Sequence, residues 1–338
     1  MTRIATPLTE LLGIDLPVVQ AGMSWASSSS ALPLAVSRAG GLGVVAAGPM
    51  RLPDLARTLD ETAAGTDRPW AVNLPLYRAG ADEVVELLLA RRPPVLIASQ
   101  GGPRRYLDRF HDVGTVCLHV VAGVEHARKA ADAGVDGLVV VGAEAGGHPP
   151  PAMVATQVLV RAVVSAVPGV PVVASGGVAD GAGLAAMLAL GADGAQFGTR
   201  FLATEEATVH PGYKAAVVAA GVDSTRTVGR GLGTIRALDN DFTRRMTRLE
   251  EDGTELDVRR GAFASASLKD AALDGLVDTG KVEAGQSAGL VDAVLPAREV
   301  VDRIVAEYRR AVTRLPLPTE EPRPAPAGTA GTAGTAGA

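Results

Sequence analysis

The sequence is poor in aromatic residues, cysteine and basic charge, and each shortage limits the structure or the function of the protein. Aromatic side chains make up 3% of the 338 residues, whereas 47% are hydrophobic and 40 residues are glycine. The core is therefore expected to be aliphatic, with closely packed elements. A formal net charge of −5, without a cluster of lysine and arginine, argues against a nucleic-acid-binding protein. A single cysteine, Cys117, excludes an internal disulfide and a cysteine-based zinc site.

Long apolar runs are also missing. No stretch of about 18 apolar residues is free of turn signals, so no membrane span is expected. Residues 1–13 lack the continuous apolar segment of a signal peptide. We therefore expect a cytoplasmic protein that acts on a small molecule, without a membrane or nucleic-acid partner. The sequence leaves open whether the chain forms a homodimer.

Short β-branched runs alternate along the chain with segments of helical composition. The helical segments include residues 123–134, 156–167 and 180–190. The apolar runs cover residues 16–21, 41–46, 70–76, 94–99, 115–121, 137–143, 171–177 and 194–201. Eight strands that alternate with helices indicate an α/β protein with a parallel sheet, most economically closed into a (β/α)₈ TIM barrel. An open doubly wound sheet is the alternative.

The alternation of strands and helices stops after residue 201, so we expect the rest of the chain to form structures outside the barrel. We assign residues 1–201 to the barrel and 202–295 to a helical insertion lobe that covers the barrel mouth. Residues 296–315 contain a C-terminal helix that docks on the barrel. Residues 316–338 are rich in Pro, Gly, Ala and Thr, so they are expected to be a disordered tail.

Glycines mark the ends of the last two predicted strands. Strand 7 ends in Ser175-Gly176-Gly177 and strand 8 in Phe197-Gly198-Thr199. In TIM barrels a phosphate commonly binds the loops after these two strands, because backbone N–H groups of glycines and helix N-termini can approach the anion. The pattern predicts a phosphate-containing ligand but does not distinguish FMN from a sugar phosphate or a nucleotide.

Six sequence blocks, in order, resemble the nitronate monooxygenase family of FMN-dependent TIM barrels, which also includes flavin-dependent enoyl-acyl-carrier-protein reductases. The resemblance covers about residues 7–312. Its blocks are PVVQAGM with the nearby Ser24, AVNLPL, GAEAGGH, ASGGVADG, GAQFGTRF and AGQSAGL.

The resemblance implies FMN as the cofactor and assigns roles to residues of this chain. Gly22, Met23, Ser24 and Asn73 correspond to positions that line the flavin ring, and Gly146 and Gly147 to glycines that approach it. The phosphate-binding positions are Gly176, Gly177, Gln196, Phe197, Gly198 and Thr199. His148 corresponds to the active-site histidine of the family.

Two departures from the family pattern affect the substrate more than the cofactor. Val141 stands where nitronate-oxidising members often have Gln, so a polar flavin contact is absent or replaced. Pro149-Pro150-Pro151 follow the histidine and stiffen its loop.

His148 suits proton transfer, since the pKa of imidazole lies near neutrality. His119 lies in the strand-5 run and either faces the barrel mouth or is hydrogen-bonded in the core. Glu144 is expected to hold the loop through backbone N–H groups instead of taking part in chemistry. We predict no metal site.

Three functions follow from these residues. The first is oxidation of alkyl nitronates with O₂ by an FMN-dependent monooxygenase. The second is reduction of an enoyl thioester or a quinone with NAD(P)H as co-substrate. A third, from a different class, is a phosphate-metabolite barrel without flavin.

Overall fold

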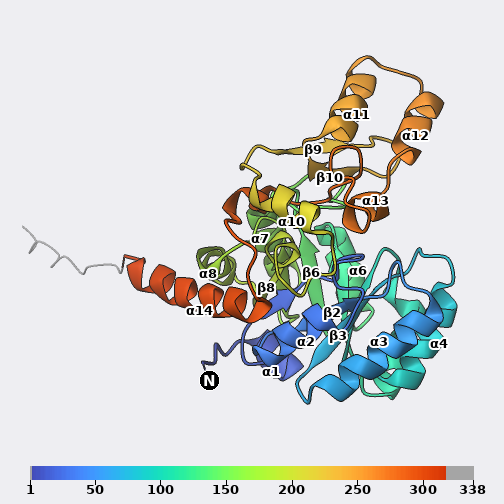
Figure 1. Cartoon of the computed structure of the whole chain (residues 1–338). Coiled ribbons are helices and arrows are strands. Elements are labelled where there is room, and N and C mark those ends of the chain that lie inside the picture. The colour runs from blue at the N-terminus through green and yellow to red at the C-terminus, as the bar shows by residue number, and fades with distance from the viewer. Residues whose placement is uncertain (1, 317–338) are drawn as a thin grey trace, which may run out of the picture.

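The computed structural model describes residues 2–316, and eight parallel strands form its centre (Figure 1). They are β1 (Val18–Gln20), β2 (Gly43–Ala46), β3 (Trp70–Pro75), β4 (Val95–Ser99), β5 (Val116–Val121), β6 (Gly137–Val141), β7 (Val172–Ser175) and β8 (Gly194–Phe197). Each one lies within a run that the sequence predicted. The prediction for the C-terminal tail falls, apart from Pro316, outside the described residues.

The sheet closes on itself, so the barrel is confirmed and the open sheet is not adopted. The strand order is β1-β8-β7-β6-β5-β4-β3-β2, and β1 pairs with β8 in parallel. Leu42, just before β2, completes the ring: its N–H donates to Val18 O and its carbonyl accepts from Gln20 N, both at 2.9 Å. Since parallel strands all point the same way, their C-terminal ends gather at one mouth.

Aliphatic side chains fill the barrel and its surroundings. Val19, Val44, Ile97 and Val173 are among the residues inside it, and Leu8 of α1 (Pro7–Leu12) packs against this cluster. The outer helices are α2 (Ala31–Arg38), α3 (Leu52–Gly65), α4 (Ala81–Arg91), α5 (Leu107–Asp112), α6 (Val124–Asp132), α7 (Thr156–Ala166) and α8 (Gly181–Ala189), with a short 3₁₀ turn, η1 (Pro103–Arg105), before α5.

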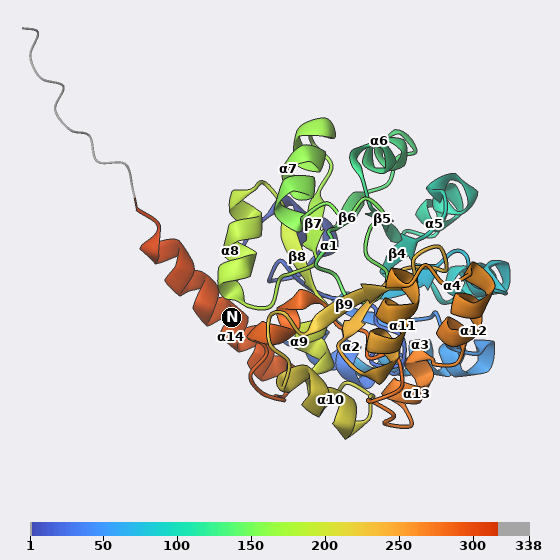
Figure 2. The same ribbon diagram turned by 90° about the horizontal axis from the view of Figure 1, so that it is seen from above.

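The lobe after the barrel contains a hairpin that the sequence did not reveal. The elements after β8 that build the lobe are α9 (Thr199–Leu202), α10 (Pro211–Val218), β9 (Thr225–Val228), β10 (Ile235–Leu238), α11 (Asp241–Glu251), α12 (Leu256–Ala264), α13 (Leu268–Ala272) and the 3₁₀ turn η2 (Gln286–Leu290). Strands β9 and β10 are antiparallel. Val228 and Ile235 of the hairpin pack with Phe242 and Met246 of α11 in a small core. Figures 1 and 2 show this part of the lobe above the barrel mouth.

The last helix, α14 (Ala297–Arg314), packs on α8 and α2. Its apolar side chains Val300, Val301 and Ile304 are buried. None of the helices in residues 2–316 is long and apolar enough to cross a membrane.

Candidate active site

A cavity of about 1630 Å³ lies between the C-terminal ends of the strands and the lobe. It brings together nearly all residues that the sequence singled out. Phe197 is the exception, because its fully buried side chain packs edge-on against Phe201 in the core. Those that line the cavity are Gly22, Met23, Ser24, Asn73, Gly146, Gly147, His148, Gly176, Gly177, Gln196, Gly198 and Thr199.

The ends of β7 and β8 form a cradle of free backbone donors. The N–H groups of Gly176, Gly177, Gly198 and Thr199 donate to no acceptor within residues 2–316. Gly177 has a φ of +75°, which a residue with a side chain adopts only with strain. A Cβ added at Gly198 would meet its nearest neighbours at 3.8 and 3.9 Å, so the space beside it is open. Convergent unpartnered N–H groups around open space suit an anion.

Side chains hold this cradle in place. Thr199 Oγ1 accepts from Gly285 N at 2.9 Å, which ties the cradle to the AGQSAGL segment and leaves the hydroxyl hydrogen free to donate. Gln196 Nε2 donates to Ser175 Oγ at 2.9 Å and so links β8 to β7. Arg200, next in the chain, is buried away from the cradle and donates to the carbonyl oxygens of Ala203 and Ala293.

Beside the cradle, the loop after β1 meets β3. A Cβ on Gly22 would lie 2.4 Å from the Cβ of Asn73, so the loop approaches β3 this closely because residue 22 is glycine. Asn73 Nδ2 donates to Ile97 O at 3.1 Å, which fixes the amide at the cavity wall. A planar group between the loop after β1 and β3 would contact backbone groups and the side-chain amide of Asn73.

The loop that carries His148 is fixed from both sides. Glu144 accepts from Thr156 N and, at 2.7 Å, from Thr156 Oγ1 at the start of α7, which ties the loop to that helix. From the lobe, the side chain of Arg236 donates through Nε and Nη2 to Ala143 O, at 3.1 and 2.9 Å. The prolines after His148 add stiffness, and Pro149 and Pro150 are buried.

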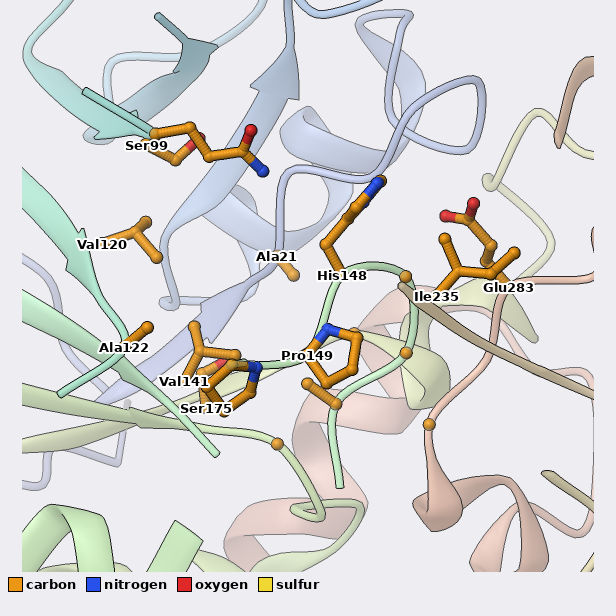
Figure 3. Close-up of a pocket in the computed structure, with 18 of the residues that line it drawn as sticks. Ala21, Ser99, Val120, Ala122, Val141, His148, Pro149, Ser175, Ile235 and Glu283 are labelled. Atoms are coloured by element: carbon orange, nitrogen blue, oxygen red, sulfur yellow. The ribbon is translucent and has the colours of Figure 1, made fainter. Parts of the chain in front are cut away.

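His148 points into the cavity (Figure 3). Its side chain hydrogen-bonds to no group within residues 2–316. The cavity walls exclude part of its hydration and lower its pKa, and the nearby positive charge of Lys281 lowers the pKa further. A neutral ring at neutral pH can accept a proton from a substrate.

Sequence reasoning missed four charged residues of the lobe that line the cavity: Arg230, Glu250, Lys281 and Glu283. Lys281 lies over the ring of Phe263, with Nζ 3.5 Å from the centroid, and Arg230 lies at the lobe edge of the cavity. Glu283 lies beside the His148 loop. No motif marks these positions, since their relation to the barrel arises from the folding of the lobe. The block AGQSAGL, which begins three residues after Lys281, was the nearest available signal.

His119 lines the cavity but is already engaged. Its Nδ1 lies 2.9 Å from the hydroxyl of Tyr106, and the two rings stack. Away from the cavity, His111, Cys117 and Asp136 bring ligand-type atoms within 4.8 Å of one another. Burial raises the pKa of the Cys117 thiol to about 12, and Asp136 Oδ2 already accepts from Cys117 N at 2.7 Å.

Known proteins resemble the chain over almost its full length. A dehydrogenase of Mycobacterium tuberculosis that acts on (3aS,4S,5R,7aS)-5-hydroxy-7a-methyl-1-oxo-octahydro-1H-indene-4-carboxyl-CoA is 35% identical over 93% of this chain and 98% of its own. A nitronate monooxygenase of Paraburkholderia phytofirmans is 31% identical over 91% and 96%. The structure of FabK from Thermotoga maritima superposes with a TM-score of 0.86 at 36% identity, over 92% and 98% of the two chains.

The nitronate monooxygenase family matches residues 5–85 and 77–307, and its proteins are flavoproteins. The match spans both the barrel and the lobe, including the cradle, the His148 loop and the Glu283 segment. The chain is therefore a flavin oxidoreductase that belongs to the nitronate monooxygenase family.

Proposed function

We propose that the protein binds FMN and oxidises or reduces the carbon–carbon bond next to the carbonyl of an acyl-CoA thioester. The cradle at β7 and β8 suits the FMN phosphate, because it offers four free N–H donors around open space. The space between Gly22, Asn73 and Gly147 suits the ring. When bound, FMN supplies the two-electron chemistry of the reaction.

The volume and the extent of the cavity are the main support for the proposal. A pocket for one drug-sized ligand has roughly 300–1,000 Å³, whereas this cavity has about 1630 Å³ and extends from the cradle to Arg230 at the lobe edge. FMN and a nitronate of a few atoms leave much of that volume empty. FMN and an acyl-CoA together occupy this volume. The acyl group then lies at His148, and the anionic part of CoA lies toward the basic residues Arg230 and Lys129.

The neutral state of His148 fits the chemistry at the acyl end. In the oxidation direction, His148 takes a proton from the carbon next to the thioester carbonyl. As the carbon–carbon double bond forms, the neighbouring carbon would give up a hydride; bound FMN would supply the two-electron acceptor, with a nicotinamide nucleotide as the final acceptor. Reduction is the reverse. The name of the Mycobacterium tuberculosis relative, a dehydrogenase of a CoA thioester, supports this class of substrate.

An anaerobic titration tests the proposal. The FMN-loaded protein is mixed with NADH or NADPH, bleaching of the flavin is followed, and crotonyl-CoA is then added. Reoxidation of the flavin with formation of butyryl-CoA is the expected result. A protein that turns over a propyl nitronate under air with release of nitrite, but neither bleaches with a nicotinamide nucleotide nor reacts with crotonyl-CoA, would instead be a nitronate monooxygenase.

A further inference from the structure

Glu283 lies next to the loop that carries His148, although 135 positions separate them in the sequence. A Cβ on Gly147 would lie 3.2 Å from Glu283 Oε2. The chain around it is anchored: Val282 is buried and its carbonyl accepts from Leu238 N at 2.9 Å, while Gly285 N donates to Thr199 Oγ1. Figure 3 shows the Glu283 carboxylate and the His148 ring projecting into the same cavity from different segments.

The carboxylate of Glu283 has no partner in the part of the chain that the structure describes. Its backbone carbonyl accepts from the hydroxyl of Tyr213 at 2.7 Å, but no donor is within reach of its side-chain oxygens. The other two carboxylates that line the cavity are satisfied, Glu144 by Thr156 and Glu250 by the N–H groups of Gly229 and Arg230. An unpartnered carboxyl at a partly buried position is costly to stability and is typical of a functional group.

The surroundings of Glu283 favour the protonated acid. Burial raises its pKa to about 7, and the positive charge of Lys281 only partly opposes this. The other titratable or charged groups on the neighbouring segments are His148, which follows Gly147, Arg236 on β10, which pairs with Gly147, and Tyr213 on α10, whose hydroxyl donates to the Glu283 carbonyl. A neutral acid that can donate and a neutral imidazole that can accept therefore face one cavity.

We infer that Glu283 is a second catalytic residue, whose carboxylic acid donates a hydrogen bond to the thioester carbonyl oxygen of the substrate. Negative charge builds on this oxygen while His148 removes the proton from the adjacent carbon. A donor already in place stabilises this charge without further reorganisation. The inference rests on the proposed function and names the group that makes the carbon acidic.

Two substitutions distinguish this role from a structural one. Glu283→Gln keeps a donor but cannot ionise, whereas Glu283→Ala removes the donor. Glu255→Gln, an exposed change in the same lobe, is the matched control. In the wild type, kcat for the oxidation of butyryl-CoA, in which His148 is the base, is expected to fall as the pH rises through about 7, because the acid ionises. The Gln variant should retain activity and lose this decline, and the Ala variant should lose at least about tenfold at pH 6.

A binding measurement provides a readout independent of turnover. Acetoacetyl-CoA forms a coloured enolate when its carbonyl oxygen is stabilised, so its spectrum reports the donor directly. The enolate fraction on the FMN-loaded protein should fall in Glu283→Ala and persist in Glu283→Gln. Unchanged spectra and an unchanged pH profile in both variants, with normal turnover, would overturn the inference alone. Failure of any CoA thioester to bind the wild type would overturn the proposed function and the inference together.

Discussion

Gly147 and Arg236 exchange two backbone hydrogen bonds across the boundary between barrel and lobe. Gly147 N donates to Arg236 O at 3.1 Å, and Arg236 N donates to Gly147 O at 2.7 Å. The Arg236 side chain, which is 6% exposed, adds bonds to Ala143 O and to Thr225 Oγ1. The loop of His148 thus pairs with β10, at one edge of the β9–β10 hairpin. The position of the histidine depends on the lobe as much as on the barrel.

We expect Arg236→Lys to impair catalysis more than flavin binding. A lysine cannot donate to both Ala143 O and Thr225 Oγ1 through a planar fork, so the loop is less well fixed and kcat should fall at least about tenfold. The FMN affinity should change little, because the cradle lies on other strands. Arg226→Lys, an exposed residue of the same hairpin, is the control. Equal kcat values for Arg236→Lys and the wild type would contradict this positioning role.

Gly198→Ala should weaken FMN binding without unfolding the protein. The added methyl group makes only ordinary contacts with Ala21 and Met23 in the protein itself, but it projects into the open space beside the free N–H groups of the cradle. We expect the Kd for FMN to rise at least about tenfold, as the anion moves away from its donors. Flavin fluorescence quenching measures Kd, and thermal unfolding of the flavin-free protein measures stability. Gly261→Ala, a helical site with no near neighbour, is the control.

Lys281→Met should shift the acid side of the pH profile upward. The positive charge of Lys281 helps to lower the pKa of His148. In the oxidation of butyryl-CoA, His148 acts as a base, so activity is lost when the pH falls below that pKa. Removing the charge raises the pKa toward its ordinary value of about 6.5, and activity should be lost at a higher pH. The dependence of kcat/KM on pH reports the free enzyme. An unchanged acid limb would mean that burial alone sets the pKa.

The barrel and the cradle could be predicted from the sequence because their signals are local. A buried strand such as Val172–Ser175 is a β-branched run that ends in glycines, and the fold itself places the ends of β7 and β8 side by side. Asp180 likewise follows a local rule: its side chain caps α8 by accepting from Gly183 N at 2.7 Å.

The hairpin and the lobe side of the cavity could not be predicted in this way. Strands β9 and β10 have four residues each, and their connection contains Gly229, Gly231 and Gly233, all with positive φ. A short strand that pairs with a neighbour and with the His148 loop has little alternation of its own. Lys281 and Glu283 are ordinary charged residues in the sequence, and they acquire their properties from burial against Phe263 and Gly147.

Glu283→Gln should stabilise the flavin-free protein at pH 8 but not at pH 4.5. The pKa of this carboxyl rises from 4.5 to about 7 on folding, so the native state binds the proton more tightly than the unfolded state. Wild-type stability is therefore lost as the pH rises from about 4.5 through 7. The amide does not ionise and escapes this loss, which we place on the order of 1–2 kcal/mol because the side chain is only partly buried. Urea unfolding at the two pH values, with Glu255→Gln as the control, measures the difference. A Gln variant that is no more stable than the wild type at pH 8 would show that the carboxylate stays well hydrated, and that it does not serve as a neutral donor at physiological pH.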